Sequence, residues 1–332
     1  MQKLHIRNIL VPVDLSRMSI QGVETARRLA QSFAATVHLA HVYPPVEGRA
    51  LAAAAIAWHE PPASLARAVR EGLSSELKAL ASKCGLSTAD NIHIKEGAPV
   101  FDVICRLAAE IPADLLVVPT HAFKGVKRFF LGSTAERLIQ HSPCPVLVDR
   151  GAPAQSAAKR SLRGPSLRIE KILVPVDFSN CSRDGVRYAI QFARRFGSRI
   201  TVLHVLDLGY SKPSDMETMA RWKGFAGTCV RQLFKEVRQE MREVIGSAPF
   251  GRVRSKTKIT VGPPVEQISD FASANDFDLI ITSTHGLTGF KHVRMGSVAE
   301  DLVRQSRVPI LVVPSHPETR AAHLVDDRMA KK

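Results

Sequence analysis

The sequence predicts an α/β protein built from two doubly wound domains, each a five-stranded, mainly parallel sheet flanked by helices. An internal repeat indicates the two domains, and the alternation of short β-branched runs with helical patterns inside each copy indicates the fold. The length of 332 residues agrees with this, because a half of roughly 150 residues can bury its own core. Hydrophobic residues make up 45% and charged residues 23% of the chain, which is typical of a globular protein.

The repeat begins with the segment Ile-Leu-Val-Pro-Val-Asp-Leu-Ser at 9–16, which returns as Ile-Leu-Val-Pro-Val-Asp-Phe-Ser at 172–179. Five more blocks return in the same order: His41-Val42 as His204-Val205, 97–100 as 262–265, Thr120-His121 as Thr284-His285, Gly132-Ser133 as Gly296-Ser297, and 145–148 as 309–312. The chain is therefore interpreted as a duplication, with copies at 1–149 and 168–315. A basic linker rich in Ala, Ser and Pro (150–167) joins them, and a tail (316–332) follows.

In the first copy, β-branched runs predict strands at 9–13, 37–42, 92–95, 115–118 and 146–148. Apolar residues at helical spacing predict helices at 19–33, 64–83, 99–110 and 133–141. This order implies parallel strands joined by right-handed crossovers, with helices on both faces. In the second copy, unbroken apolar runs at 172–176 and 279–281 fit strands that are buried on both sides.

Ligands in such sheets bind beyond the carboxyl ends of the strands, where the strand order reverses. Asp14, Asp177, His121 and His285 all lie at or just after predicted strand ends.

The most informative segment lies in the second copy, where Ser283-Thr284-His285-Gly286 is followed by nine residues and then Gly296-Ser297. Gly286 would let the backbone approach a ligand closely or adopt positive φ. Gly296-Ser297 begins a predicted helix whose N-terminal amides suit an anion. The Ser297 hydroxyl can either cap that helix or donate to a phosphate oxygen. Lys291 and Arg294, on the intervening loop, could supply positive charge.

This segment resembles the nucleotide signature of the universal stress protein family: a glycine, two residues, a glycine, nine residues, then glycine and Ser or Thr. An Ile-Leu-Val-Pro-Val-Asp first strand, a Gly-x-Pro before the third helix and a Pro-Val-Leu-Val closing strand match as well. The resemblance covers both copies, about nine tenths of the chain, so the protein looks like a tandem member of the family. It implies Rossmann-like domains that pair within one chain, as a pseudo-dimer, through their closing strands.

The match has departures. Ser283 replaces the first glycine of the signature in the second copy, and the three glycine positions of the first copy are Pro119, Ala122 and Gly132. Proline and alanine restrict the backbone where the family keeps glycine. We therefore expect the second domain to retain nucleotide binding and the first to have weakened or lost it.

The resemblance implies that ATP or a related adenine nucleotide, with or without Mg²⁺, acts as a regulatory switch in a stress response. Its adenosine end would contact Pro175, Val176 and Asp177, with His204 and Val205 near the base. Gly286, Gly296, Ser297 and Val298 would surround the phosphates, and Ser283 and His285 are further expected nucleotide contacts. The first-copy equivalents are Val13, Asp14, Ala122, Gly132, Ser133 and Thr134. The sequence names no catalytic residue, so the expected activity is at most slow ATP hydrolysis.

Plainer interpretations stay open beside these. Asp14 and Asp177 could cap turns, and Gly286 and Gly296 could be turn glycines. The histidines are expected to order loops or line the sheet, since no second metal ligand follows at useful spacing. The alternative function is a protein-interaction or scaffolding module that binds no nucleotide. A protein partner and a homodimer of the whole chain are also left open.

The net charge of +15 raises the question of nucleic-acid binding. Arg252, Arg254, Lys256 and Lys258 alternate along an expected strand, one face of which would be a basic stripe. The basic run at 221–242 is instead interleaved with glutamates and reads as a solvated helix face. Aromatic residues make up only 6% and do not interleave with basic ones, so nucleic acid is not the favoured partner.

Other classes of protein are disfavoured. The longest unbroken apolar run (50–58) has nine residues, whereas a bilayer span needs about 20. The N-terminus lacks the apolar core of a signal peptide. Five scattered cysteines without a Cys-x-x-Cys pair argue against a disulfide framework or a zinc site. We expect a cytoplasmic, soluble protein with no membrane contact.

Overall fold

The computed structural model describes residues 4–45, 62–86, 91–120, 131–150, 167–207, 226–284 and 296–314. Its strands are β1 (Asn8–Pro12), β2 (Thr36–Tyr43), β3 (Ile92–Glu96), β4 (Leu115–Thr120), β5 (Val146–Arg150), β6 (Lys171–Pro175), β7 (Arg199–Leu206), β8 (Ser255–Val261), β9 (Leu279–Ser283) and β10 (Ile310–Val313). The described helices are α1 (Arg17–Phe33), α3 (Pro62–Lys83), α4 (Val100–Glu110), α5 (Ser133–His141), α6 (Asn180–Phe196), α8 (Ala226–Ser247), α9 (Pro264–Ala274) and α10 (Ser297–Gln305). The predicted α/β fold is confirmed.

The strands form one ten-stranded sheet in the order β3-β2-β1-β4-β5-β10-β9-β6-β7-β8. Within each half all neighbouring strands are parallel. The halves meet where β5 and β10 pair antiparallel, with Leu147 opposite Leu311. The predicted pseudo-dimer, joined within one chain through its closing strands, is therefore confirmed.

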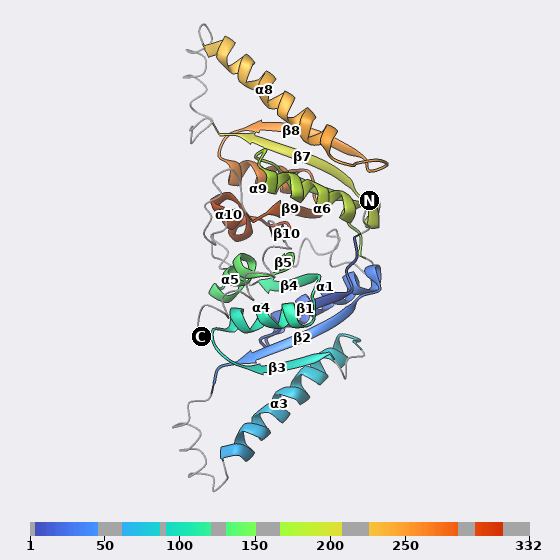
Figure 1. Cartoon of the computed structure of the whole chain (residues 1–332), viewed down its shortest axis with the longest axis vertical. Helices are drawn as coiled ribbons and strands as arrows, with labels where there is room; N and C mark the ends of the chain where they lie inside the picture. The colour runs from blue at the N-terminus through green and yellow to red at the C-terminus, as the bar shows by residue number, and fades with distance from the viewer. Residues whose placement is uncertain are drawn as a thin grey trace, which may run out of the picture.

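Successive side chains along each strand point to opposite faces of the sheet and belong to two separate hydrophobic cores. Ile9 and Val11 of β1 belong to the core under α1, α3, α6 and α8, whereas Leu10 belongs to the core under α4, α5, α9 and α10. All three side chains are fully buried, as expected for a parallel strand covered on both faces. Figure 1 shows the two halves stacked along the long axis, with α3 and α8 at opposite ends over the outer strands.

The predicted basic stripe of four residues is wrong in its extent, because only two of the four lie in a strand. The chain turns at Gly251, which has φ 56, and pairing with β7 starts only where Ser255 lies opposite Ile200. Arg252 and Arg254 therefore precede β8. Lys256 and Lys258 remain in this edge strand, and both are exposed.

Of the helices that the structure describes, none combines the length and hydrophobicity that a bilayer-spanning helix requires. Cys84, Cys105 and Cys144 are reduced and buried. Burial raises the pKa of the Cys144 thiol to about 12, which makes it a poor nucleophile at neutral pH. These buried cysteines pack as small apolar residues.

Candidate functional site

The second half contains a cavity of about 250 Å³ at the carboxyl ends of β6, β7 and β9. This is the point where the strand order reverses, between β6 and β9, and it is where doubly wound sheets bind ligands. The cavity brings together nine residues singled out from the sequence: Pro175, Val176, Asp177, His204, Val205, Ser283, Gly296, Ser297 and Val298. His285 and Gly286 lie outside the described residues.

Asp177 lies in the turn between β6 and α6. Its Oδ1 accepts hydrogen bonds from the Ser179 amide at 3.1 Å and from the Ser179 hydroxyl at 2.6 Å. The Ser179 Oγ in turn caps α6 by accepting from the Ser182 amide at 3.1 Å. Between them, Phe178 adopts the left-handed conformation with φ 68, which is unusual for a bulky residue and often marks functional sites. Asp177 therefore organises this turn while lining the cavity.

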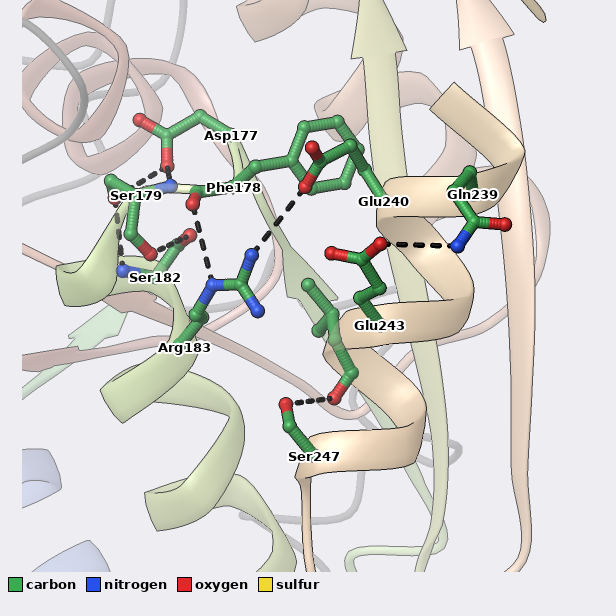
Figure 2. Close-up of polar contacts among 10 residues, drawn as sticks. Asp177, Phe178, Ser179, Ser182, Arg183, Gln239, Glu240, Glu243 and Ser247 are labelled. Carbon is green, nitrogen blue, oxygen red and sulfur yellow. Dashed lines mark hydrogen bonds and ion pairs between the residues drawn. The ribbon is translucent and has the colours of Figure 1, made fainter. Parts of the chain in front are cut away.

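Arg183 of α6 supports the same turn from outside (Figure 2). Its Nε donates to the Phe178 carbonyl at 3.4 Å, and its Nη2 lies 3.5 Å from Glu240 Oε2 on α8. The strained turn is thereby linked to α8.

The first half repeats this turn at Asp14. Its Oδ1 accepts from the Ser16 amide at 3.0 Å and from the Ser19 hydroxyl at 2.6 Å, and Leu15 has φ 62. Burial acts to raise the pKa of Asp14, but the hydrogen bonds from Ser16 and Ser19 outweigh it and the pKa is lowered. The interpretation of both aspartates as turn formers is thus correct in geometry, and it is compatible with a second role for Asp177.

His204 forms one wall of the cavity. Its Nδ1 donates to the Val176 carbonyl at 2.8 Å, which leaves Nε2 as an acceptor in the neutral ring. The ring stacks on Phe178 with centroids 4.2 Å apart. Burial lowers the pKa of His204, against the opposing effects of the Val176 carbonyl and Asp177, so the ring is neutral at neutral pH. His41 makes the same bond to Val13 at 2.8 Å.

The N-terminus of α10 forms the opposite wall. Gly296 occupies the cap position without a side-chain cap bond, and Ser297 is the first helical residue. Of the two roles expected for the Ser297 hydroxyl, capping of α10 is therefore excluded. The Gly296 amide donates to the Thr284 carbonyl at 2.8 Å. The amides of the next three residues, 297–299, have no carbonyl partner inside the helix, and all three residues line the cavity.

Gly296 has φ −61 and ψ 142, a conformation that any residue can adopt. The backbone therefore does not require glycine at this position of the cavity wall.

Comparison with known proteins shows which family has this arrangement. The model of the universal stress protein family matches residues 5–150 and 168–314. This chain belongs to the universal stress protein family. The resemblance drawn from the sequence is thus confirmed for both copies.

Individual relatives agree with this assignment. A universal stress protein of Methanocaldococcus jannaschii is 30% identical over 145 residues, covering 43% of this chain and 81% of the relative. A universal stress protein of Mycolicibacterium smegmatis is 24% identical over 320 residues, covering 92% of this chain and 96% of the relative. The crystal structure of a universal stress protein from Archaeoglobus fulgidus has the same fold, with a TM-score of 0.58 at 18% identity, covering 92% of this chain and 98% of that one.

The first universal stress protein domain differs at the end of β4. Gly132 caps α5 with φ −60 and ψ 146, like Gly296, and Ser133 and Thr134 follow it. Pro119 packs against α1, where a Cβ on Gly22 would lie 2.9 Å from the proline Cγ. At the same place in the second domain, a Cβ on Gly185 would lie 3.8 Å from the Ser283 nitrogen. The proline therefore fills space beside α1 that stays open in the second domain. His121 and Ala122 lie outside the described residues.

The sequence did not identify the apolar lining of the second universal stress protein domain. Pro264 and Ile268 of α9 and Ala299 and Leu302 of α10 complete the cavity, together with Ser182, Leu203 and Thr282. The spacing of the α9 and α10 residues is helical, so they were indistinguishable from core positions. Among the residues described, no group of three or more side chains could hold a metal ion.

Proposed function

We propose that the second domain binds ATP or a related adenine nucleotide, and that nucleotide occupancy acts as a regulatory switch in a stress response. The observation that carries this proposal is one cavity with a carboxylate at one end and a helix N-terminus at the other. An adenine nucleotide needs both, because its sugar and base donate hydrogen bonds while its phosphates are anionic.

The adenosine end is assigned to the walls around Asp177 and His204. The Asp177 carboxylate would accept a hydrogen bond from the ribose or from adenine. The neutral His204 ring offers Nε2 as a further acceptor beside Val205. Apolar contacts from Leu203 and Ile268 suit a flat ring, since binding pockets combine an apolar lining with a few placed polar groups.

The phosphate end is assigned to the start of α10. The amides of residues 297–299 and the positive end of the helix dipole favour an anion, and the Ser297 hydroxyl would donate to a phosphate oxygen. The lining at this end supplies hydroxyls from Thr282, Ser283 and Ser297. Mg²⁺ would therefore be held chiefly by the nucleotide phosphates and water, as is usual for this ion.

The proposed role is binding, with at most slow hydrolysis. Among the described residues that line the cavity, Asp177 alone has a carboxylate that could act as a general base. It is assigned to the adenosine end, away from the phosphates, and its Oδ1 already accepts hydrogen bonds from Ser179. The switch would act when the bound phosphates change a protein-contact surface; the loop expected to respond, 286–296, lies outside the described residues except for Gly296. The first domain, 1–149, is proposed to bind nucleotide weakly or not at all.

Isothermal titration of Mg-ATP into wild type, Gly296→Val and Gly132→Val tests the proposal. Wild type is expected to release heat on binding. Valine at position 296 fills the cavity wall and should weaken binding at least about tenfold, whereas the matched change at Gly132 should leave it intact. No heat from wild type at saturating Mg-ATP would contradict the proposal. In that case a protein that co-purifies in stoichiometric amount with an empty cavity would support the scaffolding alternative.

A further inference from the structure

A second hollow lies between the two domains, next to the nucleotide cavity. It has a volume of about 770 Å³ and is lined by α5 and α10, including Arg137 and His141 of the first domain and Ser297 and Glu300 of the second. Ser297 also lines the nucleotide cavity. Because Ser297 stands at the proposed phosphate end and lines both cavities, a polyphosphate tail that extends past it would enter this interdomain hollow.

The Arg137 guanidinium packs on the Phe101 ring and is not paired with a carboxylate among the described residues. Its guanidinium lies 5.1 Å from the centre of the Phe101 ring, and Phe101 packs on His141 with centroids 5.2 Å apart. Such a cation–π contact orients an arginine without neutralising its charge. In the described part of the chain, no carboxylate forms an ion pair with Arg137.

The two carboxylates of the hollow are already paired. Arg304 Nη2 lies 2.8 Å from both Glu136 Oε1 and Glu300 Oε1. The acidic groups therefore share one guanidinium, and Arg137 remains to meet an incoming anion.

The repeat makes this arrangement asymmetric. The position of Arg137 in α5 corresponds to Asp301 in α10. The first domain thus contributes a cation to the hollow from a position at which the second domain has no arginine or lysine. This difference favours an anion bound to the second domain, which also keeps more of the glycine signature.

We propose that Arg137 of the first domain binds the terminal phosphates of a nucleotide held in the second domain. The site is thereby completed across the domain junction, and it distinguishes nucleotides by the length of their phosphate tail. The inference rests on the proposed nucleotide binding and adds a specificity-determining residue to it. Arginine suits this task because its planar donors match phosphate oxygens.

Titrations of ATP and of adenosine into wild type, Arg137→Gln and Arg106→Gln test it. Arg106 is a matched control, since it is an arginine of the same domain, on α4, paired with Asp102 at 3.1 Å. Arg137→Gln is expected to weaken ATP about tenfold and to leave adenosine within about twofold, because one charge-assisted contact to phosphate is lost. Arg106→Gln should change neither affinity.

An unchanged ATP affinity in Arg137→Gln, or an equal loss for ATP and adenosine, would overturn the inference. If the inference about Arg137 is overturned in this way, binding of adenosine by wild type would still support the proposed nucleotide site of the second domain. If wild type binds neither ligand, both proposals fail together. Thermal melting of each variant shows whether an altered affinity reflects a loss of folding, which is not expected for the exposed Arg137.

Discussion

Arg304 of α10 donates from Nη2 to Glu136 Oε1 of α5 at 2.8 Å, and so joins the two domains across their junction. The same nitrogen donates to Glu300 Oε1 at 2.8 Å. Glu136 and Glu300 occupy equivalent positions of the repeat. The position equivalent to Arg304 in the first copy is Gln140, which has no charge. Burial raises the pKa of Glu300, Arg304 lowers it, and nearby Glu136 raises it further, with a net upward shift. One guanidinium therefore restrains two carboxylates that repel each other.

Arg304→Gln, which copies the residue found in the first domain, should destabilise the chain by about 1 kcal/mol or less at pH 7. The effect is small because the Arg304 and Glu136 side chains are 41% and 26% exposed. Urea unfolding measures it. The loss should shrink as the pH falls toward 4, because the raised pKa of Glu300 lets this carboxylate take up a proton, and Glu136→Gln in the same chain should recover part of it. A loss that is larger at pH 4 than at pH 7 would refute this account.

Leu311→Ala should cost about 2–5 kcal/mol in the free energy of unfolding, because it leaves a cavity at the domain junction. Leu311 is 1% exposed and lies opposite Leu147, which is 3% exposed. Combining it with Leu147→Ala should give a non-additive change of at least about 0.5 kcal/mol, since the side chains are neighbours. Val69→Ala, on the exposed surface of α3, is the control and should change stability by at most about 0.5 kcal/mol. Strict additivity of the two leucine changes would argue against a coupled junction.

His204→Asn should reduce the loss of stability on acidification. The pKa of His204 is lowered in the folded chain, so below the ordinary value of about 6.5 the unfolded state takes up a proton that the folded state resists. Stability therefore falls as the pH drops through and below that value. Asparagine keeps a donor for the Val176 carbonyl but does not titrate. Chemical unfolding at pH 7.5 and pH 5 compares the two proteins, and equal losses would show that His204 contributes nothing to the acid sensitivity.

Thr25→Val should destabilise the chain by about 1–2 kcal/mol, because it removes a hydrogen bond from a buried carboxylate. Thr25 Oγ1 donates to Asp149 Oδ2 at 2.7 Å, and the two residues are 1% and 2% exposed. Thr25→Ser keeps the hydroxyl and is the matched control. Thermal melts read out both variants. If serine destabilises more than valine does, packing of the methyl group outweighs the hydrogen bond.

The fold could be predicted from the sequence because its signals are local and occur twice. The runs at 9–13 and 172–176 are continuous apolar strands, and each is followed by Asp-x-Ser, which forms the same turn in both halves. The pairing of the closing strands was implied only by the resemblance to the universal stress protein family, and β5 and β10 do pair. The start of the basic strand was predicted too early, because Arg252 and Arg254 continue the alternation of β8. The chain still turns at Gly251, and pairing with β7 begins only at Ser255.

The polar ends of the cavity could be predicted for a similar reason, since Asp177 and Gly296 stand at strand and helix ends. Its apolar walls could not. Ile268 and Leu302 are buried members of the core under α9 and α10, and only the tertiary structure shows that they also face a cavity. The stacking of Phe178 on His204 could not be predicted from the sequence either. It requires a left-handed backbone at Phe178, which phenylalanine does not favour.

The central claim, that one nucleotide binds per chain and does so in the second domain, is tested most directly by the stoichiometry of ATP binding in isothermal titration. Wild type should bind one ATP. Asp177→Asn should weaken binding about tenfold or more, because a hydrogen bond to a charged acceptor is lost, and Asp14→Asn should leave both stoichiometry and affinity unchanged. Two equal sites per chain, or a loss of binding in Asp14→Asn with none in Asp177→Asn, would contradict the account.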